Sequence, residues 1–65
     1  MKFEITVRFF PHQVQISASE EVEWCSYEDW KEIYEAWQQS GLLLTDTRSF
    51  SEKEDLFVAQ IVLDI

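Results

Sequence analysis

The sequence is poor in the residues from which many functional sites are built. Its 65 residues include one cysteine, one glycine, one proline and one histidine. With a single cysteine no disulfide can form within the chain, so packing alone must stabilise the fold. The phosphate-binding loops and the nucleophile elbow each need at least two glycines, which excludes them here. The low glycine and proline content also argues against a disordered chain.

The residues that could support catalysis stand in unpromising surroundings. His12 lies in an expected turn, and Cys25 is surrounded by glutamates, which raise the pKa of a thiol. Carboxylates are plentiful, but on an expected solvent face nothing desolvates them into general acids or bases. The acidic group Glu52, Glu54 and Asp55 does not have the spacing of an EF-hand loop. We therefore expect a protein that is not an enzyme and that holds no metal and no cofactor.

Positive charge and long apolar runs are scarce as well. Five lysines and arginines oppose thirteen aspartates and glutamates, which gives a formal net charge of −8 at pH 7. This balance disfavours direct binding to nucleic acid or to an anionic membrane, and it favours a neutral-to-basic protein partner. No apolar run approaches the ~20 residues that span a bilayer, and residues 1–10 interleave charges with apolar side chains. We expect a soluble, cytoplasmic protein, for which solubility alone is the other explanation of the acidity.

Residues 26–41 carry the strongest pattern, which predicts one amphipathic helix. Ser26 is a favourable N-cap, and Gly41 is suited to the left-handed conformation that ends a helix. At 100° per residue, aromatic and aliphatic side chains share one face and glutamates share the other. The apolar face holds Tyr27, Trp30, Ile33, Tyr34 and Trp37, and the acidic face holds Glu28, Glu32 and Glu35. Trp30 and Trp37 are therefore expected in the core.

Alternating apolar and polar residues predict strands on both sides of this helix. Residues 2–9 and 14–18 are expected to form a hairpin around a turn at 10–13. Residues 42–47 and 56–64 are expected to supply the other two strands. Residues 19–25 are interpreted as an extended connector whose Val22 and Trp24 fold under the helix, and residues 48–55 as a polar segment with room for one helical turn.

The resulting order is ββαββ in a single domain, residues 1–65. It predicts an α+β fold in which one helix packs on a four-stranded mixed sheet, with the first and last strands parallel at the centre. This element order resembles the β-grasp arrangement of ubiquitin-like domains and of the small immunoglobulin-binding bacterial domains. A plain antiparallel meander with the helix across it is the alternative.

An acidic surface is the first candidate for function. It combines the glutamates of the connector with those of the helix, and Trp24 is a candidate anchor beside them. Its members are Glu20, Glu21, Glu23, Glu28, Glu32 and Glu35. Carboxylates presented in this way can imitate nucleic-acid phosphates, and the composition resembles that of small phage and mobile-element proteins that block host nucleases or transcription factors. We expect a protein-binding module for a basic partner surface, with the inhibitor or DNA mimic as one form of that function.

The open face of the sheet is the second candidate. If the helix covers one side, Leu56, Val58 and Val62 of the last strand lie on the other side. Such an apolar patch would support a homodimer, which makes a self-associating structural or accessory protein the alternative function. Isolated valines and leucines on an open sheet are also ordinary.

Overall fold

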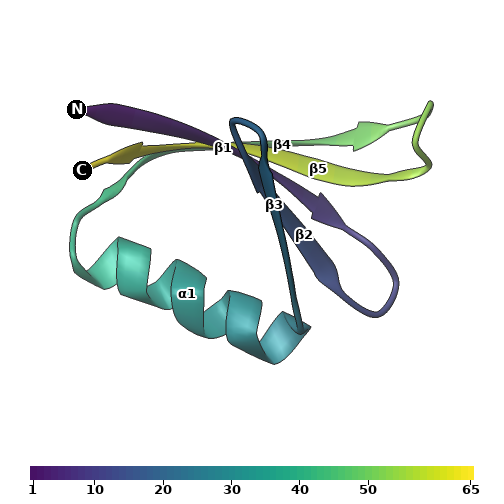
Figure 1. Ribbon diagram of the computed structural model, residues 1–65, viewed down its shortest axis with the longest axis horizontal. Helices are drawn as coiled ribbons and strands as arrows, with labels where there is room; N and C mark the ends of the chain where they lie inside the picture. Colours follow the sequence, from purple (N-terminus) through teal and green to yellow (C-terminus); the bar gives the residue numbers. More distant parts are fainter.

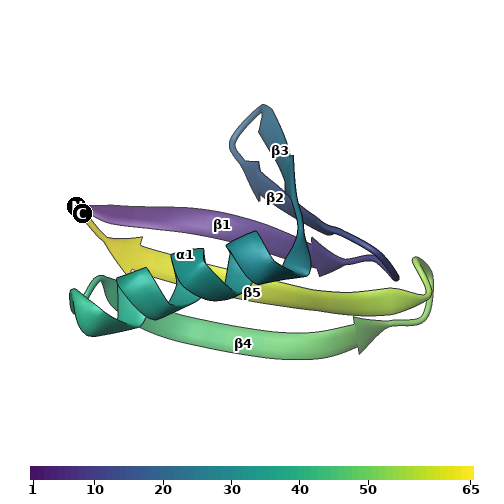
Figure 2. The same ribbon diagram turned by 90° about the horizontal axis from the view of Figure 1, so that it is seen from below.

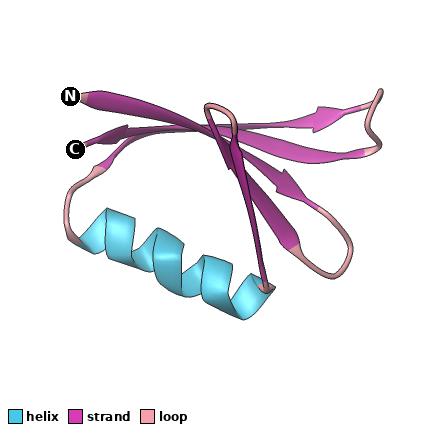
Figure 3. Ribbon diagram, viewed as in Figure 1, coloured by secondary structure: helices cyan, strands magenta, loops and turns pink.

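Five strands and one helix make up the fold. The computed structural model describes residues 1–65. In chain order the elements are β1 (Lys2–Phe9), β2 (Val14–Ala18), β3 (Glu21–Cys25), α1 (Tyr27–Gln39), β4 (Leu43–Ser51) and β5 (Leu56–Asp64). They form one antiparallel sheet in the order β3-β2-β1-β5-β4, with α1 against one face (Figure 1; Figure 3). The α+β class with a single helix is as predicted. α1 has neither the length nor the apolar content for a bilayer crossing.

β1 and β5 pair at the centre of the sheet, but they run antiparallel. Their register extends from Lys2 opposite Asp64 to Phe9 opposite Phe57. The predicted four-stranded mixed sheet with parallel central strands, and with it the β-grasp likeness, is therefore wrong. The meander alternative is right about antiparallel pairing and wrong about strand order, because β5 returns to β1 across the whole chain. This pairing brings the two chain ends together, where the Ile65 amide donates to the Met1 carbonyl at 2.8 Å (Figure 2).

The strand direction was wrongly predicted because of residues 19–25. They form a turn and an edge strand, where a connector was predicted. Ala18 pairs with Glu21 across a two-residue turn, in which Ser19 has a positive φ of 56°. β3 then pairs antiparallel with β2 along its whole length. Because this additional strand reverses the chain once more before α1, β5 runs opposite to β1.

The segment 48–55 differs from its prediction at its start, since β4 continues through Ser51, and the single helical turn that the sequence allows forms at residues 52–55. A tight turn at residues 52–55 then leads into β5. Ser51 serves as a cap within this turn, where its hydroxyl oxygen accepts from the Glu54 amide at 3.2 Å and its carbonyl accepts from the Asp55 amide at 2.7 Å. Ser51 therefore caps the helical turn that links β4 to β5.

The helix begins and ends where the sequence predicts. The Ser26 hydroxyl oxygen accepts from the Asp29 amide at 3.1 Å, which satisfies one of the free amides of the first turn. At the other end Gly41 has a φ of 75°, and its amide donates to the Gln38 carbonyl. The next amide, of Leu42, donates to the Trp37 carbonyl, which completes a Schellman motif. These caps turn the chain sharply toward β4.

Trp30 anchors the helix to the sheet. It is 6% exposed and belongs to one apolar cluster with residues of the central strands. The buried members of that cluster are Ile5, Val7, Val14, Trp30, Ala59, Ile61 and Leu63. The Trp30 ring also contacts three aromatic neighbours, with centroid distances of 5.7 Å to Phe9, 5.5 Å to Tyr34 and 5.8 Å to Trp37. The prediction that Trp30 is a core residue is confirmed.

Trp30→Ala should therefore lower the free energy of unfolding by about 3–5 kcal/mol, because it opens a cavity between α1 and the sheet. Trp24→Ala is the matched control. That side chain is 48% exposed and its one aromatic contact is the tilted ring of Phe10, so its loss should cost about 1 kcal/mol. Urea unfolding followed by circular dichroism measures both values. Equal costs for the two variants would contradict the role given to Trp30.

Candidate functional site

The six glutamates predicted as a binding surface all lie on the molecular surface. Glu20 is in the β2–β3 turn, Glu21 and Glu23 are on β3, and the other three are on α1. All six are exposed. The ion pairs of the structure involve other carboxylates, so these six have no cationic partner within the chain.

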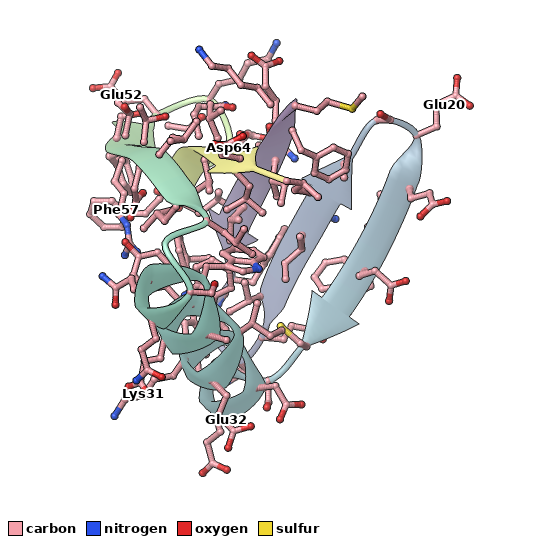
Figure 4. The ribbon with its side chains drawn as sticks, turned by 90° about the vertical axis from the view of Figure 1, so that its left-hand side faces the viewer. Glu20, Lys31, Glu32, Glu52, Phe57 and Asp64 are labelled. Carbon is pink, nitrogen blue, oxygen red and sulfur yellow. The ribbon has the colours of Figure 1, made fainter.

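The six glutamates form two groups on neighbouring elements. Glu21 and Glu23 pair across the sheet with Ala18 and Ile16, so they lie on the face of the sheet that α1 covers. A shallow hollow beside this group is lined by Phe3, Ala18, Ser19, Glu20 and Glu21. Figure 4 shows Glu20 and Glu32 at the top and the bottom of the view, pointing away from each other. The predicted surface is therefore a belt that runs from β3 onto the helix.

Lys31 interrupts the helical part of this belt. By helical geometry Glu28 and Glu35 lie within about 60° of Lys31, on the side of Lys31 that is away from Tyr34. Glu32 lies at the outermost position of the helix, away from Lys31 (Figure 4). The helical glutamates nearest to the cation are thus Glu28 and Glu35, and Glu32 is the one that is most free to meet a partner's charge.

Trp24 lies on the other side of the sheet from Glu21 and Glu23. Cys25 pairs with the core residue Val14, so by strand alternation Trp24 projects from the uncovered face. There it contacts Phe10, with 5.2 Å between ring centroids. The prediction that Val22 and Trp24 fold under the helix is wrong, because a regular strand sends alternate side chains to opposite faces.

The open face, which is the sheet face that α1 does not cover, is mainly polar. The Thr6 hydroxyl donates to Gln60 at 3.0 Å, and Arg8 donates to Glu54 at 3.0 Å and to Gln15 at 3.4 Å. The three residues predicted to support self-association stand among these groups. Val58 is 8% exposed, and Leu56 and Val62 are half-buried. They therefore offer little apolar area to a second molecule.

A polar cluster on β4 was not found from the sequence. The Tyr34 hydroxyl donates to Asp46, and Arg48 contacts the same carboxylate through Nε at 3.2 Å. The Arg48 guanidinium also lies over two rings, 5.2 Å from the centroid of Phe9 and 5.3 Å from that of Tyr34. Asp46 and Arg48 are two apart on one strand, which places them on the same face, and that spacing was the available signal. The cluster ties α1 to β4.

The pKa shifts in this region point to a structural role. The hydrogen bond to the Asp46 carboxylate, followed by burial, raises the pKa of Tyr34, so its hydroxyl stays protonated. The pKa of Arg48 is also raised, chiefly by Asp46.

Elsewhere, burial and then the charge of Asp29 raise the pKa of the Cys25 thiol, which keeps it from acting as a nucleophile at neutral pH. No group of three or more histidine, cysteine, aspartate or glutamate side chains is placed to hold a metal ion.

An aromatic hollow at the turn end of the sheet was also missed. Phe50 and Phe57 pack edge to face, with 5.0 Å between centroids, yet they are 48% and 58% exposed. The hollow is lined by Phe9, Phe10, Pro11, Tyr27, Phe50, Glu54, Asp55, Leu56 and Phe57. Phe50 and Phe57 pair across the β4–β5 hairpin. The turn of this hairpin lies beyond the part of the sheet that α1 covers (Figure 1).

Tyr34→Phe tests the polar cluster through its pH dependence. At pH 8 the variant should be less stable by about 1 kcal/mol, because it loses one hydrogen bond to a carboxylate. The raised pKa of Tyr34 means that the folded state holds this proton more tightly than the unfolded state. The contribution of the Tyr34 hydrogen bond to stability is therefore complete below the ordinary tyrosine pKa of 10.0. It is lost as the pH rises through the pKa of Tyr34 in the folded state. Urea unfolding at pH 8 and pH 11 should show the gap between wild type and variant closing, and a constant gap would contradict this.

The surfaces described above lie on different parts of the molecule. The acidic belt runs from the β3 edge onto the solvent side of α1, whereas the Tyr34–Asp46–Arg48 cluster lies between α1 and β4, and Phe50 and Phe57 lie on the β4–β5 hairpin. No protein-family model, no curated protein and no solved structure matches this chain.

Proposed function

We propose that the protein is a non-enzymatic binding module whose acidic belt engages a basic surface on a partner protein. The observation that supports this is the state of the six glutamates between positions 20 and 35. All are exposed, and none forms an ion pair within the chain. The net charge of −8 leaves little positive charge nearby to neutralise them.

Electrostatics gives such a belt a preferred partner. Glu28 and Glu32 are four residues apart, so they repel each other by a few tenths of a kcal/mol on the free helix. A cationic partner relieves that repulsion and gains a steered, fast association. Because the belt bends from β3 onto α1, the partner surface is a concave basic one that can contact both elements. A groove that ordinarily holds nucleic-acid phosphates has this chemistry, and the mimic or inhibitor is the form of the function that follows from it.

Charge reversal on the helix tests this function. Affinity capture from the source cells identifies the partner, and calorimetry then gives its dissociation constant. Glu28→Lys combined with Glu32→Lys should weaken binding by about 100-fold or more and leave the fold intact, since both side chains point to solvent. Binding of the wild type should also weaken as salt rises from about 50 to about 300 mM.

Glu4→Lys combined with Glu52→Lys is the matched control. It changes the net charge by the same amount at two exposed positions outside the belt. This variant should lose only the small, general part of the attraction. The acidic belt would be excluded as the binding site if the dissociation constant did not change with salt, or if both double variants changed it equally.

A further inference from the structure

The β4 edge of the sheet has few of the features that keep edge strands from pairing with other chains, namely Asp46, Arg48 and one bulge at its start. Edge strands are commonly protected by short length, by charged side chains, by lysine in particular, or by proline. β3, at the opposite edge, has five residues and two glutamates. β4 has nine residues with no lysine, glutamate or proline, and it pairs with β5 on one side only. Its outer backbone groups are therefore available to another strand.

The side chains of β4 are complementary to themselves about Thr47. The sequence from Leu44 to Phe50, LTDTRSF, reads in both directions as apolar, hydroxyl, charge, hydroxyl, charge, hydroxyl, apolar. In an antiparallel pair with a second copy centred on Thr47, each residue meets the one equally far on the other side. Asp46 then faces Arg48 of the second copy, and Leu44, which is within the bulge at the start of β4, comes to the level of Phe50. Opposite charges and apolar groups placed across strands in this way stabilise an antiparallel pair.

The charge balance also favours a second copy at this place. With a net charge of −8, two copies repel each other over most of their surface. Residues 42–51 contain one aspartate and one arginine, so this stretch is neutral. Asp46 and Arg48 already pair within the chain at 3.2 Å. In the antiparallel pair each Asp46 is opposite Arg48 of the second copy, so no like charges stand opposite each other across the junction.

The helices leave room for this pairing. α1 ends at Gln39, next to the beginning of β4, and the far end of β4 extends beyond the helix (Figure 2). An antiparallel pair has a two-fold axis perpendicular to the sheet, so both helices lie on the same face and at opposite ends of the paired strands. The uncovered Phe50 end of one copy then lies beside the helix-covered end of the other. The bulge between Leu43 and Thr45 is at the start of β4 and leaves Thr45–Ser51 in regular register with β5.

We propose that two copies of this chain pair through β4, antiparallel about Thr47, to form one continuous ten-stranded sheet. About six to eight backbone hydrogen bonds would form across the junction, depending on which residues direct their amides outward. The interface is a single strand pair with few side chains, so the dimer is expected to dissociate on dilution. This proposal does not depend on the acidic belt, whose glutamates lie in the β2–β3 turn, on β3 and on the solvent side of α1.

Cysteine cross-linking tests the register directly. In the proposed pair the two Thr47 residues are opposite each other, with Cα atoms about 4.5–5.5 Å apart, a separation that suits a disulfide. Thr45 would be opposite Ser49 of the second copy, which is four residues along the strand from that copy's Thr45. The two Thr45 residues would therefore be about 13 Å apart. Cys25→Ser with Thr47→Cys should therefore form a covalent dimer on mild oxidation about tenfold faster than Cys25→Ser with Thr45→Cys. Both positions lie on the same face of the same strand, so exposure is matched.

Sedimentation with charge variants supplies the second measurement. Asp46→Arg alone and Arg48→Asp alone each place like charges across the junction, so each variant should be monomeric. An equal mixture of the two should restore the dimer, because every charge then faces its opposite. A purely structural role of the Asp46–Arg48 pair would not produce this recovery. The proposal fails if the wild type sediments as a monomer from about 10 μM to about 1 mM, or if Thr45→Cys cross-links as fast as Thr47→Cys.

Discussion

The antiparallel pairing of β1 with β5 is the constraint on which the rest of the structure depends. It joins the first and last strands over eight residue pairs, and five of the eight buried residues of the protein lie on the helix-facing side of these two strands. Those five are Ile5, Val7, Ala59, Ile61 and Leu63. Trp30 packs in one cluster with these five residues and so holds α1 against the sheet. Because β1 and β5 occupy the centre, β3 and β4 are left as the two edges.

A core of this size requires support from partly exposed aromatic residues. Only eight of 65 residues are buried, as expected for a small domain with a high surface-to-volume ratio. Four aromatic pairs link Phe9, Trp30 and their neighbours at the core. Two further pairs, Phe10 with Trp24 and Phe50 with Phe57, lie outside it and are partly open to solvent. The Arg48 guanidinium extends this ring system by lying over Phe9 and Tyr34. Aromatic contact thus supplies part of the stabilisation that a larger protein obtains from full burial.

The sequence predicts the local elements better than their arrangement. Ser26 and Gly41 set the helix ends because capping depends only on neighbouring backbone groups. The alternation of apolar and polar residues in β1 and β5 also predicts strands correctly, since each strand has one buried face. β3 also alternates, but its buried-side positions are mostly glutamates, so the apolar pair of Val22 and Trp24 suggested the wrong face. The presence of β3 determines whether β5 runs parallel or antiparallel to β1. Because β3 was predicted as a connector, the direction of β5 was predicted wrongly as well.

The candidate site shows the same limit. Exposure of the six glutamates follows from helix periodicity and from the polarity of residues 19–23, whereas their division into two groups depends on how α1 is rotated over the sheet. That rotation is fixed by Trp30 in the core and by Tyr34 at Asp46, which are contacts between segments far apart in sequence. Asp46 and Arg48 were readable as neighbours on one face, but nothing local indicated that a tyrosine of the helix would join them.

The distribution of charge over the two edges connects the acidic belt with the β4 junction. Glutamates on β3 disfavour strand pairing at that edge, because two like-charged edges would repel each other in a low-dielectric contact. The same glutamates leave an attractive surface for a cationic partner. At β4 the charges are balanced and self-complementary, so the general repulsion between copies is weakest where the backbone is free to pair. A dimer formed there would carry the β3 parts of its two acidic belts at the outer edges of a ten-stranded sheet and the α1 parts on one face of it. A partner with two basic sites could then bind both belts, with an affinity raised by effective concentration and without any new contact.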